Sequence, residues 1–262
     1  MKRFQDKVVL ITGAASGIGA ATARRLVGEG ANVMLGDINE SGGRDLSEEL
    51  GTRSRFALTD VSDLTDVEAL TQEAVDHFGG LDIVINNAGI GTFGQVPDLD
   101  PKYWRKVLAV NLDSVFFGCR AAIPWLRKRG GGAIVNTASI SGLFGDYGIP
   151  AYNAAKGGVV NLTRSLAIEH SREGIRVNAV CPGPIDTPLT ARFRANSMVA
   201  EGYRRNIPIG RVGTASEVAD AIAFLASEDA RYITGVMLPV DGGLTAASGQ
   251  PDYTVAFSPD QS

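Results

Sequence analysis

The chain has 262 residues, 44% of them hydrophobic and 21% charged, and its formal net charge is −4. This length suits one large α/β domain or two small ones, and the composition is that of a soluble globular protein. The absence of a basic block argues against nucleic-acid binding, and apolar runs no longer than a strand argue against a membrane span.

The N-terminal residues and the cysteines bear on the compartment. Residues 1–6 lack the apolar segment of a secretory signal, so we expect a cytoplasmic protein. Cys119 and Cys181 fall in an expected helix and an expected strand, far apart in sequence, so we predict two buried thiols. Neither has metal-ligand spacing and the chain holds only two histidines, so we predict no metal site.

Short apolar runs alternate with helical patterns along the whole chain. This order is typical of a parallel sheet with helices on both faces, so the sequence predicts a doubly wound α/β fold in a single domain. Helix starts are predicted at Asp100-Pro101 and at the capping box of Thr214 and Glu217. The seven expected strands are near residues 7–12, 31–36, 53–58, 81–86, 133–139, 176–181 and 236–240.

A glycine-rich turn follows the first strand. Residues 12–19 read TGAASGIG and lead into a helical pattern that continues through Val27. Strand, glycine turn and helix form the dinucleotide-binding unit of the Rossmann fold. The glycines let the backbone approach a pyrophosphate, and the helix N-terminus offers it unpaired N–H groups.

An acidic residue ends the second strand. Asp37 lies eighteen residues beyond Gly19, where a ribose-binding carboxylate is expected. A carboxylate there binds the 2′- and 3′-hydroxyls of NAD and repels the 2′-phosphate of NADP. Because Ser16, Ile38 and Asn39 are all uncharged, the sequence predicts NAD as the cofactor.

Three side chains further along suggest acid–base chemistry. Tyr152 and Lys156 stand four residues apart and share one face of an expected helix. Ser139 lies thirteen residues before Tyr152, at the end of an apolar run, and Ser141 is a rival by position. A phenol beside an ammonium and a hydroxyl can protonate a carbonyl, and we expect the ammonium to lower the pKa of the phenol.

These motifs, in this order, resemble the short-chain dehydrogenase/reductase family from about residue 7 to residue 243. Residues 12–19 match its TGxxxGIG turn, residues 86–89 its NNAG motif, and residues 182–187 resemble the PG motif that covers the nicotinamide. The resemblance implies a catalytic tetrad of Asn111, Ser139, Tyr152 and Lys156. It implies cofactor contacts from Gly13, Ser16, Gly17, Ile18, Gly19, Asp37, Asp60, Val61, Asn87, Ala88, Gly89, Tyr152, Lys156, Pro182, Gly183, Ile185 and Thr187.

The resemblance also implies a role for each member of the tetrad. Tyr152 is the acid for carbonyl reduction and the base for alcohol oxidation. Lys156 lowers the pKa of Tyr152 and binds the nicotinamide ribose, and Ser139 donates to the substrate oxygen. Asn111 holds a water in a proton relay, although a satisfied core amide is the alternative for this residue.

The predicted function is therefore an NAD-dependent oxidoreductase that interconverts a secondary alcohol and a ketone. One alternative is a 3-oxoacyl-carrier-protein reductase, since four basic residues could receive an acidic carrier protein. Asp37 opposes the NADP that such reductases generally use. A non-catalytic nucleotide sensor is a third possibility, which the complete tetrad opposes. The four basic residues are Arg127, Lys128, Arg129 and Arg172.

The candidate substrate residues are mostly apolar or aromatic, which suits a small neutral substrate, apolar or cyclic. They are Thr92, Phe93, Ser141, Phe144, Tyr147, Ile149, Ile185 and Leu189.

The chain divides into a dehydrogenase domain of residues 1–244, with a substrate lid at 184–211, and a tail of residues 245–262. Tyr253, Val255 and Phe257 alternate in the tail, so we expect it to help close an active site of a neighbouring subunit. A homotetramer is predicted, paired through the two long helices that follow Pro101 and contain Tyr152. The apolar residues assigned to this pairing are Val115, Phe116, Ala122, Gly158, Leu162 and Ala167.

Overall fold

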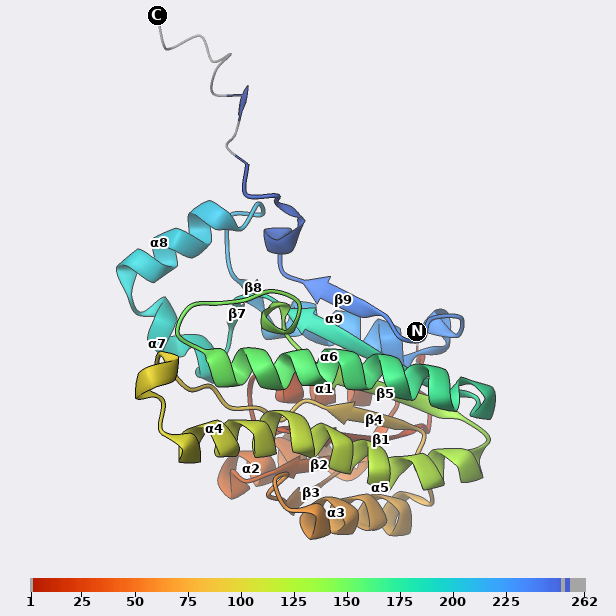
Figure 1. Ribbon diagram of the computed structural model, residues 1–262. Coiled ribbons are helices and arrows are strands. Elements are labelled where there is room, and N and C mark those ends of the chain that lie inside the picture. Colours follow the sequence, from red (N-terminus) through yellow and green to blue (C-terminus); the bar gives the residue numbers. More distant parts are fainter. Residues whose placement is uncertain (1, 251–252, 255–262) are drawn as a thin grey trace, which may run out of the picture.

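A parallel sheet of seven strands, in the order β3-β2-β1-β4-β5-β6-β9, forms the centre of the molecule (Figure 1). The computed structural model describes residues 2–250 and 253–254. Within these residues the predicted doubly wound single domain is confirmed. The strands are β1 Val8–Thr12, β2 Asn32–Asp37, β3 Ser54–Leu58, β4 Ile83–Asn86, β5 Gly132–Thr137, β6 Ile175–Pro182 and β9 Met237–Val240.

Helices cover both faces of the sheet because its central strands are apolar on both sides. Val9 and Ile11 of β1 join the core beneath one layer of helices, whereas Val8 and Leu10 join the core beneath the other. The first layer holds α1 (Gly17–Gly28), α2 (Glu40–Leu50) and α9 (Ala215–Ala226). The second holds α3 (Leu64–Phe78), α5 (Ser114–Arg129) and α6 (Pro150–His170), of which α5 and α6 lie in front of the sheet in Figure 1.

The predicted helix starts are confirmed. Asp100 accepts a hydrogen bond from the Lys102 amide at the start of α4 (Pro101–Leu108), and Thr214 and Glu217 form the capping box of α9. A π-helical turn, Ala109–Asp113, joins α4 to α5.

The run Pro101–Arg129 could cross a membrane by length and composition alone, with a mean hydropathy of 1.3 in its most apolar window. It packs instead against α3 and α6, with 44% of that window buried. Its apolar residues are those of a core helix.

The predicted subunit-pairing face is wrong in detail. Val115, Ala122 and Ala167 are at most 2% exposed, because they pack in the core of their own chain. Leu162 also packs against that core, and a Cβ on Gly158 would lie 2.8 Å from the Leu112 side chain. The exposed apolar residues of these helices are Tyr103, Trp104, Phe116 and Ile168.

The predicted lid contains β7 (Ile185–Asp186), α7 (Ala191–Arg194) and α8 (Ser197–Asn206). Strand β7 pairs in parallel with β8 (Gly213–Thr214), a pairing that strands of two residues cannot reveal through periodicity. The Phe193 ring of α7 packs on Phe93 at 4.6 Å between centroids, which ties the lid to the loop after β4. Helices α7 and α8 extend beyond the end of the sheet in Figure 1.

Beyond β9 the chain turns around Asp241, whose carboxylate accepts hydrogen bonds from the amides of Gly243 and Thr245. Within the predicted tail, Tyr253 is 66% exposed. Val255 and Phe257 lie outside the described residues, so the role of the tail stays a prediction.

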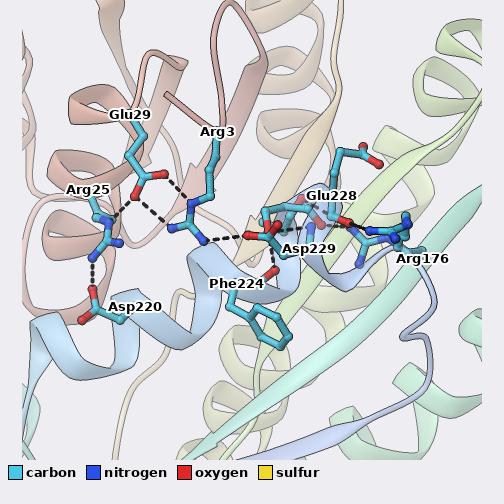
Figure 2. Close-up of polar contacts among 11 residues, drawn as sticks. Arg3, Arg25, Glu29, Arg176, Asp220, Phe224, Glu228 and Asp229 are labelled. Carbon is cyan, nitrogen blue, oxygen red and sulfur yellow. Dashed lines mark hydrogen bonds and ion pairs between the residues drawn. The ribbon is translucent and has the colours of Figure 1, made fainter. Parts of the chain in front are cut away.

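A charged network joins the N-terminal segment to α1 and α9 (Figure 2). Arg3 binds Glu29 with both Nε and Nη2, and it also pairs with Asp229. Arg25 pairs with both Glu29 and Asp220. The two guanidinium groups hold the pKa of Glu29 at about 2, below the ordinary 4.5.

Candidate active site

The carboxyl ends of the central strands open onto a cavity of about 790 Å³. Ligands of doubly wound sheets bind at this edge, where the strand order reverses between β1 and β4. Every cofactor and catalytic residue predicted from the sequence lines the cavity except Gly19 and Asn111.

The glycines of the first turn permit close contacts between backbones. Gly13 has a φ of +64°, and a Cβ there would lie 2.7 Å from Cα of Ala88. A Cβ on Gly19 would lie 2.1 Å from the carbonyl oxygen of Gly13, so Gly19 lets α1 pack against the turn. Gly19 therefore packs against the turn itself and does not line the cavity.

The ends of β1 and β4 are joined by hydrogen bonds. The Thr12 hydroxyl accepts from the amides of Asn87 and Ala88 at 3.0 and 3.2 Å. The Asn87 side chain donates to the carbonyls of Thr12 and Gly13, both at 3.1 Å. These bonds hold the glycine turn beside the NNAG segment.

Asp37 is half-buried at the end of β2 and lines the cavity. Its carboxylate accepts hydrogen bonds from the amides of Ala15 and Asn39, each at 2.9 Å. The two oxygens are thereby oriented and keep further acceptor capacity. Among the described residues, Asp37 forms no ion pair with a lysine or arginine.

Helix α6 brings Tyr152 and Lys156 to the same cavity. Lys156 is 2% exposed, and its Nζ donates to the carbonyl oxygen of Thr137 at 2.7 Å. The Nζ lies 5.7 Å from the centroid of the Tyr152 ring. Burial lowers the pKa of Lys156 to about 8.

The expected lowering of the Tyr152 pKa is wrong for the chain by itself. Burial raises the pKa of Tyr152 to about 12, and a hydrogen bond with Ser139 lowers it by a smaller amount. The Asp146 carboxylate raises it further. Desolvation of the phenolate therefore decides the direction of the shift, and the hydrogen bond with Ser139 offsets only part of it.

Ser139 lies at the end of β5 and is 7% exposed. Its hydroxyl accepts from the Ser141 amide at 3.1 Å and approaches the carbonyl oxygen of Pro182 at 3.5 Å. Ser139 is also the serine that lowers the pKa of Tyr152. Ser141 contributes its backbone amide, so the geometry favours Ser139 over its rival.

Asn111 is fully buried in the π-helical turn between α4 and α5. Its Nδ2 donates to the carbonyls of Ile90 and Val107, and its Oδ1 accepts from the Ile90 amide. The amide thus fixes the backbone that follows β4, as a satisfied core amide would. The proton-relay role stays a prediction.

The comparisons with known proteins agree with this geometry. A family model described as enoyl-(acyl carrier protein) reductase matches residues 13–245. The meso-2,3-butanediol dehydrogenase of Serratia marcescens is 43% identical over 95% of this chain and 98% of its own length. The cyclohexanol dehydrogenase of Acinetobacter sp. (strain SE19) is 43% identical over 93% of this chain and 97% of its own length. The solved structure of levodione reductase has a TM-score of 0.89 at 39% identity, and the match covers 94% of this chain and 100% of that one.

This chain belongs to the short-chain dehydrogenase/reductase family. It is an oxidoreductase of the group whose curated members include several dehydrogenases of secondary alcohols.

The cavity suits the nicotinamide dinucleotide that members of this dehydrogenase family use. Gly13 and Gly17 both have positive φ, and a Cβ on Gly17 would lie 3.3 Å from the Thr187 side chain, so the turn has no room for larger residues. Ser16 caps α1 without a side-chain hydrogen bond, and both the turn and Asp37 line the cavity. The glycine turn at the start of α1 therefore suits a pyrophosphate, and the Asp37 carboxylate suits a ribose.

The residues that line the cavity differ in part from those predicted from the sequence, most of all among the candidate substrate residues. Arg105 and Lys106 at the end of α4 line the cavity, and no motif marks them. Ile185 and Leu189 line it as expected. The aromatic candidates Phe93, Phe144 and Tyr147 are exposed and do not line it; nor do Thr92, Ser141 and Ile149.

Both cysteines are buried, as predicted, in α5 and β6. No group of three or more His, Cys, Asp or Glu that could hold a metal ion occurs within residues 2–250 and 253–254.

Proposed function

We propose that the protein is an NAD-dependent oxidoreductase that interconverts a secondary alcohol and a ketone, with Tyr152 as the general acid and base. The observation that carries this proposal is that one cavity is lined both by Asp37, which ends β2, and by Ser139, Tyr152 and Lys156, which lie after β5 and on α6. Relatives named for butanediol and cyclohexanol support the same reaction class.

Asp37 selects NAD in this proposal. Its carboxylate would bind the 2′- and 3′-hydroxyls of the adenosine ribose, and a 2′-phosphate would meet that negative charge without a cation bonded to Asp37 to offset it. Arg105 and Lys106 of α4 line the same cavity, and the Lys106 ammonium lies near enough to Asp60, which follows β3, to lower the pKa of that carboxyl. They are the residues most able to weaken the preference.

The bound nicotinamide supplies the hydride transfer and, in its oxidised form, a positive charge close to the phenol. Tyr152 gives its proton to the carbonyl oxygen in reduction and receives it in oxidation. Ser139 donates to the same oxygen, because its hydroxyl is oriented by the Ser141 amide. Lys156 has further N–H donors beyond the one that Thr137 accepts, and they are available to the nicotinamide ribose.

The substrate class is a small neutral alcohol or ketone, apolar or cyclic. Ile90, Ile185 and Leu189 line the cavity and offer it apolar surface. Relatives named for cyclohexanol and for cis-4-hydroxycyclohexanecarboxylate support a ring as the substrate body.

The structure does not favour the alternative of a carrier-protein reductase, because the basic residues on which it depends have other partners. Arg127 pairs with Glu173, Arg129 pairs with Asp82, and the Lys128 ammonium lies over the Trp125 ring. The three residues also end α5, immediately before β5 begins, so they lie at the opposite edge of the sheet from the cavity. A carrier protein bound there would lie beside the amino ends of the strands, whereas Tyr152 lines the cavity at their carboxyl ends.

We also propose that the protein is a cytoplasmic homotetramer. The exposed apolar side chains of Tyr103, Trp104, Phe116 and Ile168 support pairing through α4, α5 and α6, because a subunit interface would bury them. The experiment that tests the function is a screen of NADH and NADPH oxidation with butanone, cyclohexanone and an acetoacetyl thioester. Preference for NADH with either simple ketone supports the proposal; turnover of the thioester alone with NADPH would overturn it.

A further inference from the structure

The segment between β5 and α6 links two catalytic groups. It begins at Ser139, forms a short 3₁₀ turn at Ile140–Gly142, and ends where α6 begins at Pro150. Tyr152 follows in the first turn of α6. The way in which this segment packs on α6 therefore sets the relation between the Ser139 hydroxyl and the Tyr152 phenol.

Asn153 makes the side-chain contacts that hold the segment on α6. Its Nδ2 donates to the carbonyl oxygen of Ser141 at 2.8 Å and to that of Phe144 at 2.9 Å. Ser141 in turn donates its amide to Ser139 Oγ at 3.1 Å. A chain of hydrogen bonds thus runs from Asn153 through Ser141 to the catalytic hydroxyl.

The orientation of the Asn153 amide is set by these bonds. A reversed amide would place Oδ1 against two carbonyl oxygens, whereas Nδ2 has two hydrogens to offer them. In the observed orientation Oδ1 is buried and has no hydrogen-bond partner among the described residues. An unpaired buried acceptor is costly, so the two bonds to the segment outweigh the loss of a partner for Oδ1.

Gly142 also allows the segment to pack closely on α6, because it has no side chain. A Cβ on Gly142 would lie 2.5 Å from the carbonyl oxygen of Lys156. The backbones of the segment and of α6 therefore touch one turn beyond Asn153. Phe144 lies at the outer end of this docked stretch, with its side chain 59% exposed.

We propose that Asn153 is a positioning residue, which holds residues 141–144 on α6 so that the Ser139 hydroxyl keeps a fixed place beside Tyr152 and the substrate. This inference rests on the proposed function and assigns it a specificity determinant. A loosened segment would let Ser139 turn away from the substrate oxygen. A rigid ring depends on that placement more than a small flexible ketone does.

The test compares Asn153→Ala and Asn153→Ser with wild type and with Asn161→Ala, a control at an exposed position of the same helix. We expect Asn153→Ala to lower kcat/KM for cyclohexanone by about tenfold, as for two lost hydrogen bonds of ordinary strength. The loss for butanone should be smaller and NADH affinity unchanged. Asn153→Ser, which can restore one bond, should fall between wild type and Asn153→Ala.

The pH dependence of alcohol oxidation distinguishes a displaced Ser139 from a smaller amount of folded enzyme, because only the former moves the pH midpoint. Because the bond with Ser139 lowers the pKa of Tyr152, a displaced Ser139 should move the pH midpoint of alcohol oxidation upward in Asn153→Ala. Equal losses on both ketones with an unmoved midpoint would overturn the proposal.

Hydrogen exchange tests the inference without any substrate. The amides of residues 141–144 should exchange faster in Asn153→Ala than in wild type, and those in the middle of α6 should not change. Equal protection of residues 141–144 in both proteins would overturn the positioning role even if activity fell. A wild-type protein that reduces no ketone would instead remove the proposed function, and the exchange comparison would still decide the role of Asn153.

Discussion

The Lys156 ammonium donates to the carbonyl oxygen of Thr137 at 2.7 Å, and this bond anchors it in the wall of the cavity. The ammonium lies 5.7 Å from the centroid of the Tyr152 ring, beside the phenol and without a hydrogen bond to it. Burial raises the pKa of Tyr152 to about 12 in the same structure. The chain alone thus holds Tyr152 as a protonated acid, ready for carbonyl reduction.

Removal of that proton donor is the first prediction. Tyr152→Phe deletes the hydroxyl with little change in volume, so kcat for ketone reduction should fall by about 10²–10⁴-fold, the usual contribution of a general acid. NADH affinity, measured by fluorescence titration, should change little. A variant with normal kcat and a raised KM would assign the acid to another group.

The cofactor preference depends on Asp37. Asp37→Ala removes the carboxylate that the Ala15 and Asn39 amides orient. We expect weaker NADH binding and a narrower ratio of kcat/KM between NADH and NADPH. Asp63→Ala is a suitable control, because that carboxylate caps α3 and does not line the cavity. An unaltered ratio in Asp37→Ala would contradict the assignment.

The network around Glu29 predicts a pH-dependent stability. The pKa of Glu29 is about 2 in the folded chain and 4.5 for an ordinary glutamate. The depressed value means that the stabilisation is fully present above pH 4.5 and is lost as the pH falls toward 2. Glu29→Gln should therefore lower the free energy of unfolding at pH 7 by about 1–2 kcal/mol, after allowance for solvent screening of the partly exposed arginines.

Denaturant titrations at several pH values measure this difference. The gap between wild type and Glu29→Gln should shrink below pH 4.5. Glu40→Gln, which breaks an exposed pair with Arg44, should change stability little at any pH. A gap that stays constant down to the acid transition would show that Glu29 acts through packing alone.

The oligomer prediction concerns the exposed apolar residues of α5 and α6. Light scattering should give a tetramer at micromolar concentration. Phe116→Asp should reduce the mass, because Phe116 is 48% exposed and a charge there would be buried in a helix-pairing interface. Met198→Asp on α8, where the side chain is 80% exposed, serves as the control. A wild-type monomer would refute the tetramer, and a stable dimer would leave only the helix pairing.

Truncation after Thr245 tests the tail. We expect a raised KM or an altered substrate preference, with the oligomer and NADH affinity preserved. Unchanged kinetics across several ketones would show that the tail does not contribute to a substrate site.

The sheet and the cofactor turn could be predicted because their signals are local. Apolar runs predicted strands such as Val8–Thr12 and Ile175–Pro182 to within a residue or two, and glycines predicted the turn that only glycine can form. The pKa of Tyr152 could not be predicted from its spacing to Lys156, since burial decides its direction. Nor could spacing show that Phe144 and Tyr147 are exposed, because loops have no periodicity, or that Asn153 contacts the segment before it.

Ketone reduction with wild type and Tyr152→Phe, each supplied in turn with NADH and NADPH, tests the central claim most directly. The account predicts that wild type oxidises NADH with cyclohexanone or butanone, that NADPH is a much poorer cofactor, and that Tyr152→Phe is nearly inactive while it still binds NADH. Equal turnover with both cofactors, or an active Tyr152→Phe variant, would contradict it.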